Sequence, residues 1–532
     1  MSGDAPWWRG ATIYQIYPRS FVDSNGDGVG DLPGITAALP HVAALNVDAI
    51  WLSPFYKSPM LDFGYDVSDF CDVDPVFGTL ADFDRLVSRA HELGLRVIVD
   101  QIYSHSSDQH PWFRESRASR DNPRADWYVW ADPKPDGSPP NNWQSLFGGP
   151  AWHWDARRRQ YYLHNFLPAQ PDLNVHNPAV QAALLDVARF WLKRGVDGFR
   201  LDAINYAMHD PGLRDNPPAP DRGTVRTRPS DFQLPIHNQG HPLLLDFIRS
   251  IRRLTEEHGG KFTVAEVGGL DALPAMKMLI QGTDRLHSAY GFDFLYAERL
   301  TPALVRSVLE AWPSHGDALW PSWAFSNHDA PRAVSRWAAP EHRDAFARLA
   351  MLLLISLRGN VFLYYGEELG LPQASIDFED LQDPEAIANW PLTLGRDGAR
   401  TPMPWRGDDP FGGFSTCLPW LPVVPEQLAL NVSDQQRQPG SMLAWTRQLM
   451  ALRKTNMALR EGDLQVLEAG DALLVIERRT ATQQLRCVFN LASAPLPRPA
   501  SAPTTWRTLA QTGNPQAVLL PGFSGLILEK TP

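Results

Sequence analysis

The chain has 532 residues, of which 44% are hydrophobic, enough for one barrel-sized domain with smaller domains beside it. Its 49 Lys and Arg residues against 60 Asp and Glu residues give a net charge of -11 without any basic cluster, which argues against binding of nucleic acid or an anionic membrane. The three cysteines (Cys71, Cys417 and Cys487) are widely separated, so they predict neither a disulfide framework nor a zinc site. Without a secretion-signal pattern or a membrane-length apolar run, we expect a soluble, cytoplasmic protein.

A helix followed by a short apolar strand is the repeating unit of most of the chain. After a first strand in "ATIYQIYPRSF", the pattern predicts a strand at Ala49–Leu52 and another that ends at Asp100. The helix in "NPAVQAALLDVARFWLKRG" is expected to begin at Asn177-Pro178 and to end at Gly195, before the apolar run "GFRLDAI". Further strands are expected in "KFTVAE", "RLHSAYGFDF", "WAFSNHD" and "GNVFLYYGEE". This alternation predicts a (β/α)8 TIM barrel.

Two irregular segments and a change of pattern divide the chain. Residues 102–170 are rich in Trp, Pro, Asp and Gly, which is typical of an inserted domain, and about 371–429 form a second irregular segment after the last strand. After about residue 460, short alternating runs such as "ALLVIERR" and "QLRCVFNLAS" predict a C-terminal antiparallel β-sandwich. The predicted domains are therefore a barrel (1–101 and 171–460), an inserted domain (102–170) and a C-terminal domain (461–532).

Acidic residues follow several of the predicted strands. Catalytic groups of a barrel gather where its strands end, and Asp100, Asp202, Glu266 and Asp329 all lie at such points. Residues two apart on a strand share a face, so Arg200 points the same way as Asp202. Each acid alone is explained as well by a helix cap or a salt bridge. Together they indicate a pair of carboxylates with different pKa values, which acetal cleavage requires.

Several short motifs resemble the α-amylase family of glycoside hydrolases. These are "DQIYSH", "GFRLDAI", "VAEV" and "SNHD", in that order along the chain. The further motifs "LDFGYD", "QPDLN" and "GRDGARTPMPW" resemble the α-glucosidase branch of the family, which includes oligo-1,6-glucosidases and bacterial transglucosylating α-glucosidases. The likeness covers essentially the whole chain.

The resemblance implies roles for the acids. Asp202 matches the nucleophile that forms a covalent glucosyl-enzyme, and Arg200 matches the residue that keeps this carboxylate ionised. Glu266 matches the general acid/base, and its apolar neighbours in "VAEV" favour a raised pKa. Asp329 matches the third acid, which binds sugar hydroxyls. The implied reaction is a retaining double displacement.

The resemblance also implies a pocket for one terminal glucose unit. Asp62 and Arg396 would close its far end, Phe147 and Tyr206 would line the pocket or its acceptor side, and Arg332 would border the acceptor side. Arg400 we interpret as structural. The positions that match glucose-binding residues are Asp62, Tyr65, His105, Phe166, His328 and Arg396.

Two positions bear on geometry and linkage. Ser104 stands where the family has asparagine before His105, so the local geometry is expected to differ. Ala203 follows the nucleophile; in this branch valine there goes with α-1,6 cleavage, and threonine or alanine with α-1,4 cleavage. We therefore expect maltose-like α-1,4 donors.

The stretch "DSNGDGVGD" offers oxygen ligands in a glycine-containing turn. It resembles the start of an EF-hand loop, but Gly34 stands where that loop has glutamate. The family resemblance implies a structural Ca²⁺ or Mg²⁺ site; a polar turn without metal is the alternative. The implied ligands are Asp23, Asn25, Asp27, the carbonyl of Val29, and Asp31.

The leading hypothesis is a retaining α-glucosidase that also transfers glucose to hydroxyl acceptors, acting as a monomer or homodimer without an organic cofactor. The alternatives are an oligo-1,6-glucosidase, a sucrose hydrolase or isomerase, and a non-catalytic barrel. The sequence lacks the acceptor motif of sucrose isomerases, and it retains all three acids, whereas the non-catalytic barrels that resemble this family lack much of that set.

Overall fold

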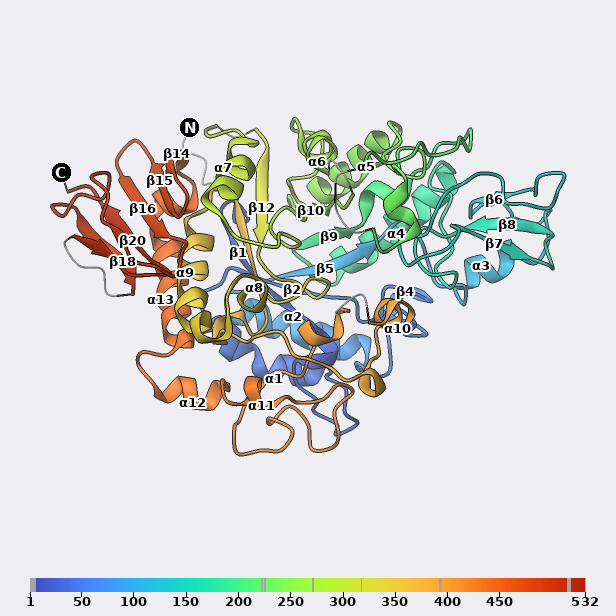
Figure 1. Ribbon diagram of the computed structural model, residues 1–532. Coiled ribbons are helices and arrows are strands. Elements are labelled where there is room, and N and C mark those ends of the chain that lie inside the picture. Colours follow the sequence, from blue (N-terminus) through green and yellow to red (C-terminus); the bar gives the residue numbers. More distant parts are fainter. Residues whose placement is uncertain are drawn as a thin grey trace.

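The computed structural model describes residues 6–221, 223, 226–269, 272–316, 318–391, 395–513 and 518–531. Its centre is a closed barrel of eight parallel strands in the order β1-β13-β12-β11-β10-β9-β5-β2, closed by pairing of β1 with β2 (Figure 1). The predicted (β/α)8 barrel is confirmed. The strands are β1 (Thr12–Ile16), β2 (Ala49–Leu52), β5 (Arg96–Ile102), β9 (Gly198–Asp202), β10 (Phe262–Glu266), β11 (Ser288–Tyr290), β12 (Trp320–Ala324) and β13 (Asn360–Tyr364).

Helices cover the outside of the barrel and explain why its strands are continuous apolar runs. A parallel strand is buried on both faces, by the barrel interior and by the helices. In α4, Asn177 caps the first turn by accepting the Ala179 N–H, and Gly195 leaves the helix with a φ of +94°. The helices that follow barrel strands are α1 (Leu32–Ala43), α2 (Leu80–Glu92), α4 (Pro178–Lys193), α5 (Leu244–Glu257), α6 (Ala272–Ile280), α7 (Pro302–Glu310), α8 (Ala333–Trp337) and α9 (Arg343–Ser356).

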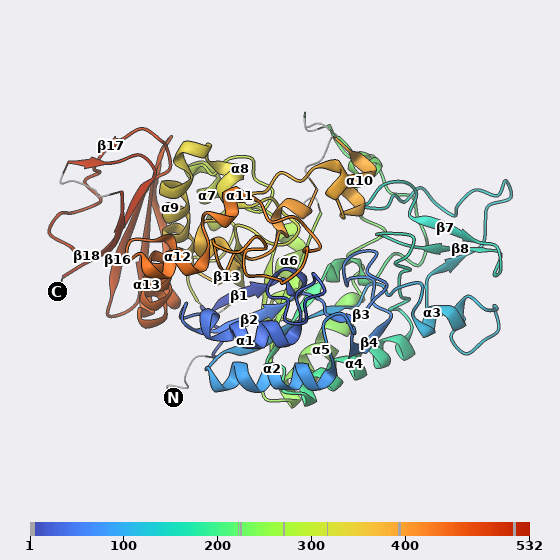
Figure 2. The same ribbon diagram turned by 90° about the horizontal axis from the view of Figure 1, so that it is seen from below.

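The segment between β5 and α4 forms a small unit beside the barrel. It contains a three-stranded antiparallel sheet in the order β6-β8-β7 around a cluster that includes Trp143 and Trp152. Figure 2 shows this sheet on the side of the barrel opposite the C-terminal sheet. Its elements are α3 (Pro111–Ser116), β6 (Trp130–Ala131), β7 (Trp152–Asp155) and β8 (Gln160–Leu163), and β3 (Tyr56–Lys57) pairs with β4 (Asp69–Val73) earlier in the chain.

The C-terminal part is a five-stranded antiparallel sheet in the order β14-β15-β16-β20-β18, with a small β17-β19 ribbon. One face of the sheet packs on the barrel helix α9 through residues that include Leu474 and Ile527. No helix among the described residues is long and apolar enough to cross a membrane. The strands are β14 (Asp463–Ala469), β15 (Leu473–Arg479), β16 (Gln484–Asn490), β17 (Leu496–Pro497), β18 (Arg507–Thr512), β19 (Leu519–Leu520) and β20 (Ser524–Glu529).

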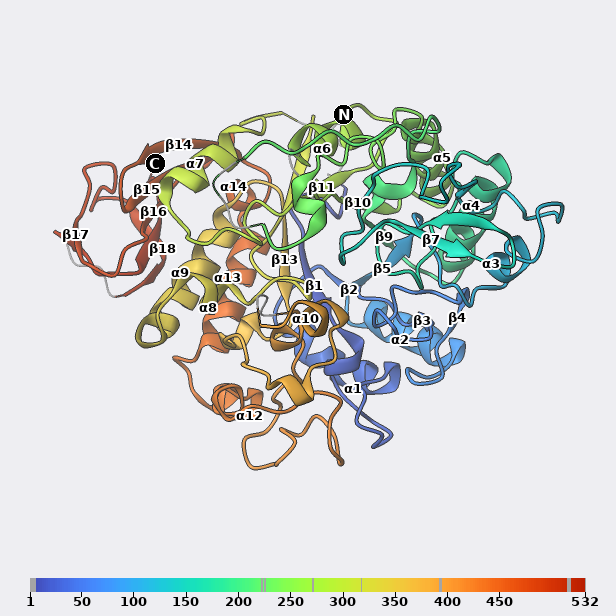
Figure 3. The same cartoon turned by 45° about the vertical axis from the view of Figure 1, so that its right-hand side comes forward.

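Three loop regions meet at the carboxyl ends of the barrel strands. They are the inserted segment after β5, the long loop after β9 and the segment after β13, which contains α10 (Figure 3). Parallel register places Ala265 of β10 beside Leu201 of β9, so Glu266 and Asp202 end neighbouring strands. The remaining helices after β13 are α10 (Pro384–Asn389), α11 (Pro425–Leu428), α12 (Val432–Arg437), α13 (Met442–Thr455) and α14 (Met457–Arg460).

Candidate active site

One buried arginine connects the acids at the mouth of the barrel. Nη1 of Arg200 donates to Asp100 at 2.7 Å and to Asp202 at 2.6 Å, while Nη2 contacts the carboxylate of Glu266. Nε of Arg200 donates to the Tyr290 hydroxyl at 3.1 Å. Because the guanidinium is fully buried, its charge acts on these acids with little screening by solvent. A single cation therefore holds Asp202 and Glu266 on the same side of the site.

Two of the three acids that contact Arg200, Asp202 and Glu266, have strongly shifted pKa values. Burial raises the pKa of Asp202 to about 7 and that of Glu266 to about 7, in each case against the opposing charge of Arg200. Glu266 also accepts hydrogen bonds from Tyr290 at 3.1 Å and from the N–H of Ala203 at 3.2 Å. Ala203 reaches this carboxylate because its backbone is left-handed, with a φ of +38°. At neutral pH this environment suits a pair in which one acid is ionised and the other protonated.

The third acid, Asp329, is held by cations. Arg400 donates to its carboxylate at 2.8 Å, Arg396 at 3.4 Å, and Nε2 of His328 lies 3.2 Å away. Burial opposes ionisation of Asp329, but His328, Arg400 and Arg396 together hold its pKa well below the usual range. Tyr65 stacks on His328 and its hydroxyl lies 2.5 Å from Nε2 of that ring. Asp329 is therefore ionised at physiological pH.

An ion pair closes one end of the site. Nη2 of Arg396 donates to Asp62 at 2.8 Å, and Asp62 also accepts from Nε2 of Gln170 at 3.1 Å. The buried carboxylate of Asp383 accepts from Arg396 at three donors: the backbone N–H at 2.7 Å, Nη2 at 2.9 Å and Nε at 3.1 Å. Asp383 thereby fixes the direction in which Arg396 reaches Asp62.

Aromatic side chains line the cavity beside this ion pair, and the guanidinium carbon of Arg396 lies 5.3 Å from the centre of the Phe147 ring. Phe166 contacts His105 with ring centroids 4.9 Å apart, and it also contacts Phe147 at 6.2 Å and Tyr206 at 5.6 Å. Nδ1 of His105 lies 2.9 Å from the hydroxyl of Ser104, so serine still orients the ring at the position where the family has asparagine. Burial lowers the pKa of His105 to about 4, which leaves it neutral at physiological pH.

These groups surround one cavity of about 830 Å³, within the usual volume range of ligand pockets. Both Asp202 and Glu266 line it, together with Ala203 and Tyr206. The other predicted site residues that line it are Asp62, Tyr65, His105, Phe147, Phe166, Asp329 and Arg396.

Three predicted substrate-binding residues lie behind the cavity surface. Arg200 and His328 act on the lining residues through the contacts given above. Arg332 does not reach the acceptor side, because its guanidinium donates to the carbonyls of Tyr365 at 2.9 Å and Ala399 at 3.0 Å. The sequence prediction placed Arg332 at the acceptor side, but the structure places it outside the lining of the cavity.

Other residues contact the site without having been predicted there. Arg400, which we interpreted as structural, binds Asp329 directly. Tyr290 faces Glu266 because β11 pairs with β10 in register, a relation that the short and poorly patterned β11 conceals. Asp383 follows "LQ" in an irregular segment and carries no local signal. Gln170 belongs to the motif "QPDLN", which could have placed it.

The predicted metal loop is held by its own hydrogen bonds. Asp23 accepts backbone N–H groups of Asn25, Gly26 and Gly28 and the hydroxyl of Ser415, while Asp31 binds Ser24 and caps α1 at Gly34. No three His, Cys, Asp or Glu side chains within the described residues are arranged to hold a metal ion. The oxygen-rich composition suits Ca²⁺, but the loop does not gather its acids around one point, so the metal stays a prediction. The loop residues are Asp23, Asn25, Asp27, Val29 and Asp31.

Comparison with known proteins agrees with this geometry. Residues 15–462 match the model of the α-amylase catalytic domain. A probable alpha-glucosidase of Rhizobium meliloti (strain 1021) is 53% identical over 92% of this chain and 90% of its own length. An oligo-1,6-glucosidase of Heyndrickxia coagulans is 36% identical over 91% of this chain and 92% of its own length.

A solved structure is similar over nearly the whole chain. The crystal structure of the alpha-glucosyl transfer enzyme XgtA has a TM-score of 0.94 and 49% sequence identity, covering 99% of this chain and 100% of that one. The family match spans the barrel and the segments that carry the three acids. The chain therefore belongs to the α-amylase family, as a glycoside hydrolase or transferase.

Proposed function

We propose that this protein is a retaining, exo-acting α-glucosidase that releases or transfers the terminal glucosyl unit of short α-glucosides. The observation that carries the proposal is the contact of Arg200 with both Asp202 and Glu266 at a cavity whose end is closed by Asp62 and Arg396. This geometry offers a nucleophile and a proton donor at one bond of a bound terminal sugar.

In the first step, the ionised carboxylate of Asp202 attacks the anomeric carbon while protonated Glu266 donates its proton to the leaving oxygen. The carbon–oxygen bond to the leaving group breaks as an ester bond to Asp202 forms. Arg200 and the Ala203 N–H keep the two carboxyl groups in place during this exchange. Asp329 stabilises the positive charge that develops on the sugar ring.

In the second step, Glu266 acts as a base. Once Asp202 is a neutral ester, one negative charge near Glu266 has disappeared, so the pKa of Glu266 falls and its carboxylate form is favoured. It takes a proton from water or from an acceptor hydroxyl, whose oxygen attacks the anomeric carbon and releases Asp202. Two inversions give a product with retained α configuration.

The closed end explains the exo mode of action. We infer that the pair of Asp62 and Arg396, joined at 2.8 Å, binds hydroxyls of the terminal unit and blocks a further sugar beyond it. The rings of Phe147, Tyr206 and Phe292 also line the cavity, and we infer that Tyr206 and Phe292 face the acceptor. An apolar surface favours an organic hydroxyl acceptor over water, which supports transfer to alcohols or phenols.

Ala203 supports cleavage of α-1,4 bonds, by the family correlation for the residue that follows the nucleophile. Hydrolysis of isomaltose as the main activity would instead favour an oligo-1,6-glucosidase. Formation of sucrose isomers, or sucrose as the main substrate, would favour the sucrose-active alternative. Product analysis with maltose, isomaltose, sucrose and trehalose separates these outcomes.

The mechanism is tested by proton NMR of freshly released glucose and by adding a phenol to the reaction. We expect α-glucose to appear first from maltose, and an α-glucoside of the phenol to form beside free glucose. Initial release of β-glucose would contradict the retaining mechanism. Absence of glucoside at any phenol concentration would contradict transfer.

We further propose that the loop of Asp23 to Asp31 takes up Ca²⁺ as a structural ion. The oxygen-rich composition supports this. Chelation should then lower the melting temperature, and Ca²⁺ should restore it, while the variant Asp27→Ala should not respond. An equal melting temperature of the wild type with and without chelator would contradict the metal.

A further inference from the structure

One arginine beyond the glucose-binding residues connects three loop regions around the cavity. Nη1 of Arg228, in the loop after β9, lies 3.0 Å from the carboxylate of Glu385, in the first turn of α10. The same nitrogen donates to the carbonyl of Leu146, in the inserted segment, at 3.3 Å. The loops after β9 and β13 and the inserted segment are thus joined at one guanidinium.

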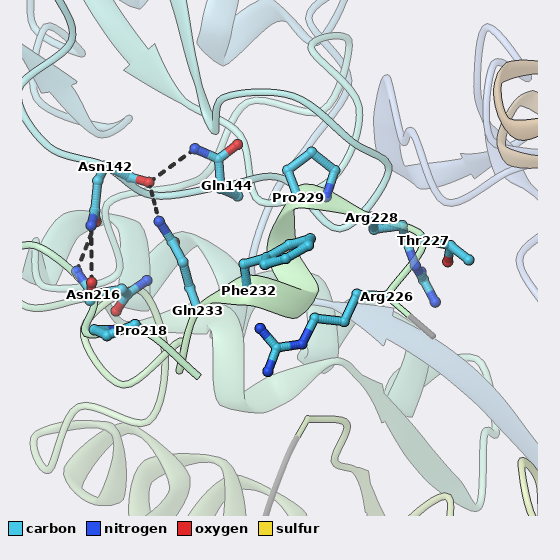
Figure 4. Close-up of a pocket in the computed structure, with 10 residues that line it drawn as sticks. All are labelled: Asn142, Gln144, Asn216, Pro218, Arg226, Thr227, Arg228, Pro229, Phe232 and Gln233. Carbon is cyan, nitrogen blue, oxygen red and sulfur yellow. Dashed lines mark hydrogen bonds between the residues drawn. The ribbon is translucent and has the colours of Figure 1, made fainter. Parts of the chain in front are cut away.

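This arginine stands between two hollows. Arg228, Glu385 and Leu146 line the catalytic cavity, and Arg228 also lines a neighbouring groove of about 640 Å³ (Figure 4). The residues shared by the cavity and the groove are Gln144, Asn216, Arg226, Thr227, Arg228 and Gln233. Arg228 therefore stands at the border of the two hollows, and Glu385 binds it from the cavity side.

Both ends of the ion pair are fixed by their surroundings. The carboxylate of Asp231 accepts the backbone N–H groups of Thr227 at 3.1 Å and Arg228 at 3.0 Å, at the start of the short helix η3 (Pro229–Phe232). On the other side, Asp383 caps α10 by accepting the N–H of Glu385 at 3.1 Å. Neither backbone therefore has to be ordered for the pair to form, so the entropic cost is confined to the two side chains.

The groove has the chemistry to take a further sugar unit. Figure 4 shows the amides of Asn142, Gln144 and Gln233 at one end and the ring of Phe232 beside Arg226. The ring of Phe232 is 54% exposed, and the guanidinium carbon of Arg226 lies 4.9 Å from its centre. Amides supply donors and acceptors for hydroxyls, and the ring supplies an apolar face.

We propose that the Arg228–Glu385 pair determines substrate length, by separating the acceptor side of the catalytic cavity from the amide-lined groove. The inference rests on the proposed α-glucosidase activity. With the pair in place, the cavity accommodates a short leaving group; without it, the groove joins the cavity and binds the next unit of an α-1,4-linked oligosaccharide.

The experiment compares maltotriose with maltose as donors for the wild type, Arg228→Ala, Glu385→Gln and the double variant. We expect each single variant to raise the ratio of kcat/KM for maltotriose to that for maltose by about fivefold, the scale of a partly exposed ion pair. The double variant should raise this ratio no more than either single variant does, because the same interaction is lost in all three. The charge-exchanged variant R228E/E385R should return the ratio towards that of the wild type.

A matched control is Arg252→Ala on α5, which breaks the pair with Glu256 (2.6 Å) away from the cavity and should leave the ratio unchanged. Raising the ionic strength from about 0.05 to about 0.5 M should raise the ratio for the wild type but not for the double variant.

The outcomes distinguish this proposal from the proposed function. If the wild type releases glucose from maltose but both single variants have the same ratio as the wild type, the proposal about substrate length is wrong. The proposed α-glucosidase activity is then unaffected. A rise of the ratio in Arg228→Ala but not in Glu385→Gln would also overturn the proposal, because Glu385 would then have no part in determining substrate length. If the wild type releases no glucose from maltose or 4-nitrophenyl α-glucoside, the proposed function itself fails.

Discussion

Fully buried arginines occur both at the mouth of the barrel and at its junction with the C-terminal sheet, and their surroundings differ. Arg200 at the mouth faces the carboxylates of Asp100, Asp202 and Glu266. Arg453 at the junction donates instead to carbonyls, those of Ile355, Leu357, Gly359 and Leu459. Burial disfavours the charge of each, but the acids hold the pKa of Arg200 well above its ordinary value, whereas that of Arg453 lies well below.

This difference between carboxylate and carbonyl partners distinguishes a site that can react from a contact that only stabilises the fold. Carbonyl groups satisfy a guanidinium but cannot change their charge, so Arg453 can only hold chain segments together. Carboxylates exchange protons, and a fixed cation between two of them controls which one is ionised. The mouth of the barrel can therefore carry out acid–base chemistry, and the junction cannot.

The largest expected effect is loss of the nucleophile. Asp202→Gly should lower kcat for 4-nitrophenyl α-glucoside by about 10⁴-fold or more, the scale seen when a catalytic nucleophile is removed. Added azide should restore turnover and yield β-glucosyl azide, because the small anion occupies the space of the missing carboxylate. Formation of the α-azide, or an activity near that of the wild type, would exclude Asp202 as the nucleophile.

Methionine in place of each arginine tests the comparison directly. Arg200→Met should lower kcat/KM by about 10²–10³-fold, because two acids lose their counter-charge. Arg453→Met should instead destabilise the protein by about 3 kcal/mol, because buried carbonyls lose their donors. Rates and urea denaturation of both variants provide the measurements. An Arg453→Met variant that is fully stable yet catalytically impaired would break the distinction.

Asp383 is expected to act through Arg396. Asp383→Asn keeps the size of the side chain but weakens its hold on the guanidinium, so KM for maltose should rise about tenfold with a smaller change in kcat. Steady-state kinetics with maltose measure this. Asp344→Asn, which weakens an exposed pair with Arg348 on α9, serves as the control and should leave KM unchanged. A fall in kcat at constant KM would contradict a role in holding glucose.

The smallest expected effect is a shift in pH dependence. Activity rises as Asp202 ionises and falls as Glu266 loses its proton; since both pKa values are about 7, kcat/KM should have a narrow maximum near neutral pH. Tyr290→Phe removes a donor to the Glu266 carboxylate, which raises the pKa of Glu266 and moves the alkaline limb upward by less than about one pH unit. Tyr162→Phe in the inserted sheet should not move it. A downward shift of the alkaline limb in Tyr290→Phe would contradict the expected rise in the pKa of Glu266.

Sequence patterns predicted the barrel, and they singled out three acids that line one cavity, because both leave local signals. The α4 cap at Asn177, the glycine stop at Gly195 and the strand that carries Arg200 and Asp202 are each set by neighbouring residues. Contacts between distant segments leave no such signal. Arg400 and Arg332 lie in similar motifs, yet only Arg400 reaches a catalytic acid, because the direction of a long side chain depends on packing around it.

The first turn of α10 joins two kinds of recognition within three residues. Asp383 holds Arg396, which pairs with Asp62, and Glu385 bonds to Arg228 in the loop after β9. A deletion or insertion in this turn would disturb the grip on the terminal glucose and the choice of leaving group at the same time. Directed evolution of new acceptor preferences should therefore vary Arg228 on the other loop first, where a change leaves glucose binding intact.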